Sequence, residues 1–162
     1  MTVRALQGRL FATDYRFALV VSRYHDFVTD KLQAGALAAI AAAGGRTEDV
    51  VVLSVPGAFE IPSAARHAAE TGRFDAIVCL GCLVRGATPH FDFIAAAVAH
   101  GLTAASAETA VPMTFGVLTT NSIEEALERA TDGPANKGWE AAVAAIEMAE
   151  VAARLAQLTR TP

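Results

Sequence analysis

A run of small residues around one histidine carries the clearest chemistry in this sequence. Residues 81–93 read Gly-Cys-Leu-Val-Arg-Gly-Ala-Thr-Pro-His-Phe-Asp-Phe, between an apolar strand-like segment and an alanine-rich helical pattern. The first amide groups of a helix lack partners within it and lie at the positive end of its dipole, so such a junction readily binds a phosphate. An imidazole titrates near neutral pH. The run therefore predicts an anionic substrate held beside an acid–base group, His90.

The elements that must position this junction alternate along the chain. Apolar runs rich in β-branched residues predict four strands, at residues 16–22, 49–55, 74–83 and 113–118. Helical patterns are found between and after them, at residues 27–43, 61–71, 90–105, 123–130 and 137–158. Continuous apolar strands joined by helices are typical of a parallel sheet covered on both faces. We therefore expect an α/β fold with three layers, a flavodoxin-like parallel sheet in the order 2-1-3-4 and helices on both faces.

The length of 162 residues predicts a single domain over residues 1–162. Residues 1–14 are less regular, although residues 3–11 fit an edge strand. Hydrophobic residues make up 53% of the chain, which favours subunit association; alanine-rich helices alone are the alternative explanation. The net charge of −4 argues against a nucleic-acid partner. With no signal-peptide pattern or membrane-spanning run, the sequence predicts a cytoplasmic protein without membrane contact.

The two cysteines, Cys79 and Cys82, have the CxxC spacing of a redox pair or half a zinc site. Three steps along a strand place side chains on opposite faces, about 10 Å apart. A disulfide needs Cα atoms within about 7 Å, and a second CxxC that would complete a zinc site does not occur in the sequence. We therefore interpret both as small buried residues at a strand end and expect no metal site.

Polar and aromatic residues follow each predicted strand. Ligands of open parallel sheets bind at the carboxyl ends of the strands, where Tyr24, Glu60 and His90 should converge. The alternatives are that Tyr24 and Phe59 only cover the core and that Glu60 only complements a helix dipole. Lys137 stands at a helix start, where a cation opposes the dipole and favours an anionic partner; a solvated lysine is the alternative.

Several ordered motifs resemble the lumazine synthase family, the 6,7-dimethyl-8-ribityllumazine synthases. The resemblance extends from about residue 8 to residue 149, and its motifs are residues 56–62 (PGAFEIP), 81–93, 115–120 (FGVLTT) and 136–138 (NKG). It implies a transferase of riboflavin biosynthesis that condenses 5-amino-6-ribitylaminouracil with 3,4-dihydroxy-2-butanone 4-phosphate, releasing phosphate and water. It also implies that no cofactor is needed.

The resemblance also implies a role for each matching residue. His90 would transfer protons, and Tyr24 would stack on the pyrimidine ring. Other contacts to the ribitylaminouracil would come from Ala58, Phe59, Glu60, Cys82, Leu83, Val84 and Phe115, the last from a neighbouring subunit. The butanone phosphate would be bound by Ala87, Thr88, Arg129 and Lys137.

Assembly is a further implication of the resemblance, because the family forms homopentamers that pair into decamers or build sixty-subunit shells. Residues 131–135 depart from the glycine- and lysine-containing segment linked with the shells, and His25 stands where asparagine is frequent. Two alternatives to an enzyme are a flavin- or nucleotide-binding module on the same fold and a shell protein without activity. Residues 22–25 match a flavodoxin-type FMN loop poorly, and the presence of Glu60, His90 and Arg129 argues against an inactive shell.

Overall fold

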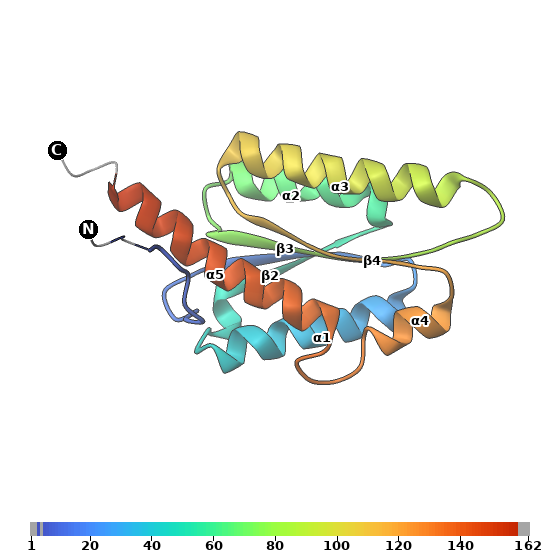
Figure 1. Ribbon diagram of the computed structural model, residues 1–162, viewed down its shortest axis with the longest axis horizontal. Helices are drawn as coiled ribbons and strands as arrows, with labels where there is room; N and C mark the ends of the chain where they lie inside the picture. Colours follow the sequence, from blue (N-terminus) through green and yellow to red (C-terminus); the bar gives the residue numbers. More distant parts are fainter. Residues whose placement is uncertain (1–2, 4, 159–162) are drawn as a thin grey trace.

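The computed structural model describes residue 3 and residues 5–158, and these form one sheet flanked by helices (Figure 1). The strands are β1 (Phe17–Ser22), β2 (Val50–Val55), β3 (Ala76–Val84) and β4 (Met113–Thr120). The α-helices are α1 (Asp26–Ala42), α2 (Ile61–Glu70), α3 (His90–Thr109), α4 (Ile123–Glu128) and α5 (Lys137–Leu158). Two short 3₁₀ turns are η1 (Thr47–Asp49) and η2 (Ala58–Glu60).

All strand pairs are parallel, and the strand order is β2-β1-β3-β4, which confirms the predicted fold class and order. Helices α2 and α3 cover one face of the sheet, and α1, α4 and α5 cover the other (Figure 1). Ser22 pairs with Val55 at the carboxyl ends of β1 and β2, while β3 and β4 continue together to Val84 and Thr120. The carboxyl ends of the strands thus form one edge of the molecule.

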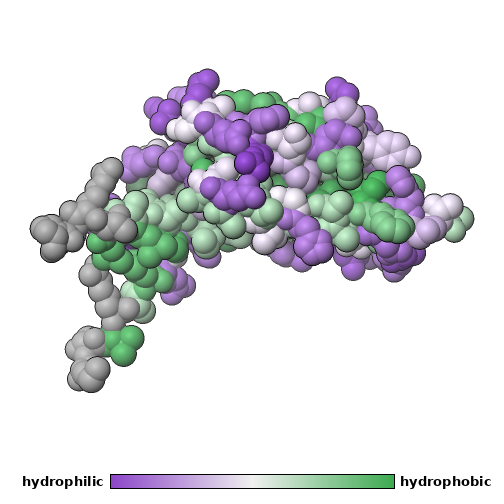
Figure 2. Space-filling model, turned by 90° about the horizontal axis from the view of Figure 1, so that it is seen from above, coloured by the Kyte–Doolittle hydropathy of each residue, from purple (hydrophilic) through white to green (hydrophobic). Residues whose placement is uncertain are grey.

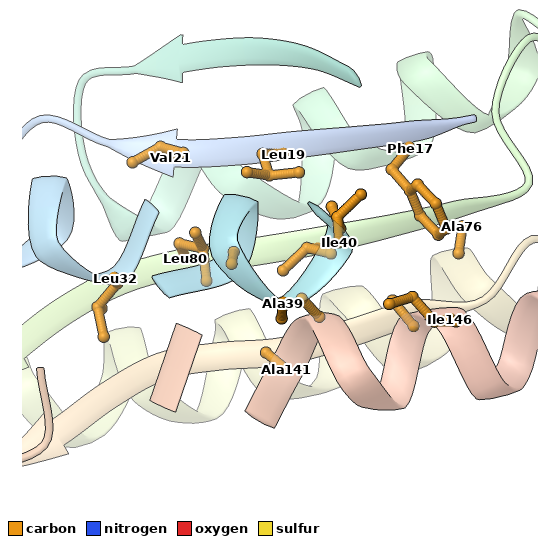
Figure 3. Close-up of a cluster of buried hydrophobic side chains, with 14 of the residues drawn as sticks. Phe17, Leu19, Val21, Leu32, Ala39, Ile40, Ala76, Leu80, Ala141 and Ile146 are labelled. Atoms are coloured by element: carbon orange, nitrogen blue, oxygen red, sulfur yellow. The ribbon is translucent and has the colours of Figure 1, made fainter. Parts of the chain in front are cut away.

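The larger hydrophobic core lies between the sheet and helices α1 and α5 (Figure 3). Phe17 and Leu19 from β1 and Leu80 from β3 pack there against Ile40 of α1 and Ile146 of α5. Each of these five side chains is at most 2% exposed. A second buried cluster fills the opposite face, where Ala18, Val20 and Ile77 are among the residues beneath α2 and α3. Burial on both faces explains the continuous apolar runs of β1 and β3. The edge strand β2 differs from this expectation, because its Val51 and Val52 side chains are 39% and 41% exposed.

The start of α5 packs very closely against α1. A Cβ atom at Gly138 would stand 1.9 Å from the backbone oxygen of Leu32, so only glycine fits there. The Asn136 Oδ1 accepts a hydrogen bond of 2.8 Å from the Gly138 amide, and its Nδ2 donates one of 3.1 Å to the Lys31 carbonyl. The residues around Lys137 are therefore fixed to α1 by backbone contact and by a largely buried amide side chain.

The expected edge strand at residues 3–11 is wrong for the part that the structure describes: residue 3 and residues 5–11 form no strand, and residue 4 lies outside the described residues. The segment follows α5 instead. The Arg9 backbone amide donates to the Glu150 carboxylate, and the Arg9 Nε and Nη2 atoms each lie 2.7 Å from it. Gly8 lies so close to Glu147 that a Cβ would collide with its backbone. This buried-carboxylate contact, rather than a sheet edge, positions the segment.

The boundaries of several elements also differ from the predicted ones. β4 extends two residues further, to Thr120, because it pairs with β3 along its whole length. α3 continues to Thr109 instead of residue 105, whereas α5 has the predicted bounds, Lys137–Leu158. Among the described residues, no helix is long and apolar enough to cross a membrane.

Exposed apolar surface gathers at two places on the face that Figure 2 shows: the end near the chain termini and the opposite end, where α3 begins. The exposed aromatic residues of the molecule include Tyr24, Phe59 and Phe93, with exposed fractions of 67%, 62% and 73%. Exposed apolar clusters of this kind are typical of binding surfaces.

Candidate active site

A cavity of about 1060 Å³ lies at the carboxyl ends of the strands and against the start of α3; we call it the β3–α3 cavity. Its volume is at the upper end of the range of small-molecule sites, roughly 300–1,000 Å³. It is lined by Tyr24, His25, Gly57, Ala58, Phe59, Glu60, Cys82, Leu83, Val84, Gly86, Thr88, His90, Phe91, Phe93, Ile94 and Ala97. Nine of the thirteen predicted site residues are therefore brought together in one place.

Tyr24 and His25 form the wall that follows β1. The Tyr24 amide donates a 3.1 Å hydrogen bond to the Pro56 carbonyl, which joins this loop to the one after β2. His25 precedes α1 with a left-handed backbone, φ 59° and ψ 48°. This conformation is uncommon for residues other than glycine and is best tolerated by Asn, Asp and His. The His25 ring packs edge-on against Tyr24 and Phe27, at centroid distances of 4.5 and 5.8 Å, so the exposed Tyr24 ring has lateral support.

The turn η2 forms the wall that follows β2. Ala58 is buried, whereas Phe59 and Glu60 are exposed. The Glu60 Oε2 accepts a 2.9 Å hydrogen bond from the Gly57 amide, which closes the turn and orients the carboxylate. Glu60 thus has a structural role in the turn η2, and it also lines the cavity.

Residues 82–84 at the end of β3 form the floor of the cavity. Cys79 and Cys82 are free thiols, buried in the two opposite clusters, which confirms the structural interpretation of the CxxC spacing. Burial raises the pKa of the Cys82 thiol to about 11, so it stays protonated and unreactive at neutral pH. Within the described part of the chain, no three His, Cys, Asp or Glu side chains are grouped so that they could hold a metal ion.

Thr88 and His90 line the cavity from the connection between β3 and α3. His90 is the first residue of α3, and no side chain caps the start of this helix in the described structure. The first amides of α3 thus have no side-chain partner, and an anion bound there stays a prediction. Ala87 is exposed and lies outside the lining residues, so the structure does not bring it to the cavity with Thr88.

The sequence interpretation missed the part of the cavity that α3 supplies beyond its first turn. Phe93, Ile94 and Ala97 follow His90 at steps of three, four and seven residues. Such residues share one helix face. This spacing from a candidate catalytic residue is the signal that could have found them.

Three other predicted residues, Phe115, Arg129 and Lys137, line a second cavity of about 460 Å³, which we call the β4–α5 cavity. Its lining includes every residue from 114 to 120, so it follows the free edge of β4, together with Arg129 and residues of α5 such as Lys137 and Glu140. The Lys137 amide donates a 2.9 Å hydrogen bond to the Arg129 carbonyl, which keeps the two cations side by side.

Both cations of the β4–α5 cavity have partners within the chain. The Lys137 Nζ lies 2.8 Å from the Glu140 carboxylate, and an Arg129 Nη atom donates a 2.9 Å hydrogen bond to the Glu125 carbonyl. Phe115 is 48% exposed at the same edge. The two cavities share no lining residue, so Phe115, Arg129 and Lys137 are not brought to His90 by the folding of one chain.

Comparison with known proteins shows which family this chain resembles. The family model of 6,7-dimethyl-8-ribityllumazine synthase matches residues 14–153. A protein of that name from Chlorobium phaeobacteroides (strain BS1) is 50% identical over 148 residues, which cover 91% of this chain and 96% of the relative. The proteins of that name from Chlorobaculum tepidum and Syntrophus aciditrophicus (strain SB) are 49% and 48% identical, covering 93% and 90% of this chain and 97% and 94% of theirs. The chain therefore belongs to the 6,7-dimethyl-8-ribityllumazine synthase family.

Proposed function

We propose that this chain is an active 6,7-dimethyl-8-ribityllumazine synthase whose site is completed by a neighbouring copy of the chain. The reaction condenses 5-amino-6-ribitylaminouracil with 3,4-dihydroxy-2-butanone 4-phosphate and releases phosphate and water, as a step of riboflavin biosynthesis. Glu60, Thr88 and His90 all line the β3–α3 cavity, which supports an active enzyme rather than an inactive shell protein.

The ribitylaminouracil would occupy the β3–α3 cavity. A planar heterocycle is bound well by an aromatic platform, and Tyr24 offers an exposed ring that His25 supports at its edge. The Glu60 carboxylate, already oriented by the Gly57 amide, accepts hydrogen bonds from the ribityl hydroxyl groups. Backbone groups of residues 82–84 face the uracil from the floor. This placement leaves the 5-amino group of the uracil toward the start of α3.

The butanone phosphate would bind with its phosphate at the start of α3, beside Thr88. Attack of the 5-amino group on its carbonyl carbon gives an imine with loss of water. Removal of the proton from the adjacent hydroxyl-bearing carbon then expels the phosphate as an anion, and attack of the ribitylamino nitrogen on the resulting ketone closes the second ring with loss of water. Each step needs a proton moved, and His90 is the imidazole that lines the cavity at this point. Holding two substrates together also lowers the barrier, because it converts a bimolecular encounter into an intramolecular reaction.

The proposal of a shared site is supported by one observation: the predicted binding residues are divided between two separate cavities. Phe115, Arg129 and Lys137 lie at the free edge of β4, and this edge can meet the β3–α3 cavity of another copy. A head-to-tail contact of this kind uses two different surfaces and generates a ring when the rotation from one copy to the next closes. We infer a ring of five subunits in the cytoplasm; pairing of rings or a sixty-subunit shell would add further contacts without changing the site.

Complementation between two inactive variants tests the shared site. Thr88→Asp places a carboxylate in the phosphate subsite of the β3–α3 cavity, and Arg129→Glu reverses the charge in the β4–α5 cavity. When the two denatured proteins are mixed equally and refolded together, about a quarter of the sites in a random ring combine two intact halves. We therefore expect about a quarter of the wild-type activity from the mixture and almost none from either variant alone.

The control for this experiment mixes Thr88→Asp with Tyr24→Asp. Both variants alter the β3–α3 cavity, so no site in a mixed ring has this cavity intact. Activity in this control, or none in the test mixture although sedimentation shows mixed rings, would contradict the shared site. An active monomer at assay concentration in analytical ultracentrifugation would also overturn it.

A further inference from the structure

An ion pair on the outer side of the β3–α3 connection has no role in the mechanism described above. Arg85 follows the last residue of β3, and Asp92 lies in the first turn of α3. The two guanidinium Nη atoms of Arg85 each donate a 3.0 Å hydrogen bond to a different carboxylate oxygen of Asp92. The same guanidinium stacks on the Phe91 ring, 4.4 Å from its centre. Arg85 thus contacts the first turn of α3 through a bidentate ion pair and through stacking on an aromatic ring.

These contacts join the two ends of the loop that carries the predicted phosphate subsite. Residues 86–90 span the wide connection from β3 to α3 that Figure 1 shows beyond the edge of the sheet. Gly86, Thr88 and His90 line the β3–α3 cavity, whereas Arg85 and Asp92 are outside its lining residues. The Arg85 amide also donates a 2.9 Å hydrogen bond to the Thr120 carbonyl, which anchors the start of the loop to β4. The loop is therefore held at both ends by residues outside the cavity.

The side chains of this ion pair are too exposed for the pair to contribute much to the stability of the fold. The Arg85 and Asp92 side chains are 45% and 56% exposed. Exposed pairs contribute little to folding stability. A bidentate arginine–carboxylate contact does fix a relative orientation, which lysine cannot reproduce. It also engages both oxygens of a carboxylate that would otherwise repel a phosphate at the start of α3.

We propose that Arg85 and Asp92 are positioning residues, whose ion pair fixes residues 86–90 so that Thr88 and the first amides of α3 meet the phosphate. The inference rests on the assignment of this loop as the phosphate subsite. Loosening the loop displaces the phosphate-binding groups and His90 together, and small displacements of such groups cost large factors in rate. The ribitylaminouracil contacts of the β3–α3 cavity lie in the segment after β1, on η2 and on β3, and do not depend on residues 86–90.

Steady-state kinetics of single and double variants test the proposal. We expect Arg85→Gln and Asp92→Asn each to raise the KM for butanone phosphate about tenfold, with the KM for ribitylaminouracil unchanged within about twofold. The double variant should resemble either single one, because both remove the same ion pair. Arg85→Lys should recover only part of the loss, since it keeps the charge but not the bidentate geometry.

Arg66→Gln is the matched control, because Arg66 of α2 forms exposed ion pairs with Glu70 of the same helix and with Glu108 near the end of α3, outside the lining of the β3–α3 cavity. Kinetic constants of Arg85→Gln equal to those of Arg66→Gln would overturn the proposal. A lower KM for butanone phosphate in Asp92→Asn would also overturn it, because it would show that released Arg85 binds the phosphate directly. Thr88→Val tests the subsite separately: if it leaves this KM unchanged, the phosphate assignment fails, whatever the Arg85 variants do.

Discussion

Replacing Gly138 with alanine tests how the start of α5 is positioned. The new Cβ would stand 1.9 Å from the Leu32 oxygen and 2.6 Å from its carbonyl carbon, and both are backbone atoms that no rotamer change can move. Ordinary contacts of such atoms are about 3.5 Å, so α5 must move away from α1 by more than about 1 Å. Overpacking of this kind costs about 3 kcal/mol, and the higher helix propensity of alanine offsets at most about 1 kcal/mol of it.

The expected loss of about 2–3 kcal/mol corresponds to a decrease of roughly 5–10 °C in the Tm of a chain of this size. Thermal unfolding followed by circular dichroism measures it, at one fixed protein concentration because subunit association also contributes. Gly86→Ala is the control, since a Cβ there meets no atom within 4 Å. A Tm of Gly138→Ala within about 2 °C of this control would refute the packing argument.

Three further perturbations have outcomes set by single residues. His90→Ala should lower kcat by about a hundredfold or less, since positioning of two substrates supplies the rest of the acceleration; an unchanged kcat across about pH 6 to 8 would contradict its role as acid–base group. Arg129→Ala should raise the KM for butanone phosphate tenfold or more, and equal losses for both substrates would indicate an assembly defect instead. The hydrogen bond from Arg9 holds the pKa of Glu150 below its ordinary value of 4.5, so this contact stabilises the fold at neutral pH and is lost as the pH falls below that value. Glu150→Gln should therefore flatten the decline of Tm with acidification, and an identical acid profile would exclude the contact.

Most of the fold could be predicted from the sequence because its signals are local. Each strand is a short apolar run, and the alternation of such runs with helical patterns predicts a parallel sheet. The bounds of α5, Lys137–Leu158, were predicted fully. The prediction of an edge strand at residues 3–11 is wrong, because Arg9 pairs instead with the Glu150 carboxylate on α5, 141 residues away. No local sequence pattern indicates such a contact.

The sequence by itself determined which residues stand at the carboxyl ends of the strands, since alternation of strands and helices fixes the edge at which they converge. It therefore placed Tyr24, Glu60 and His90 in one cavity. Only the tertiary structure decided that Phe115 and Arg129 lie in another, because the distance between two loops depends on how β4 and α5 pack at the edge of the sheet. The close approach of α5 to α1 at Gly138 likewise depends on how the two helices pack in space, and the periodicity of the sequence does not predict it.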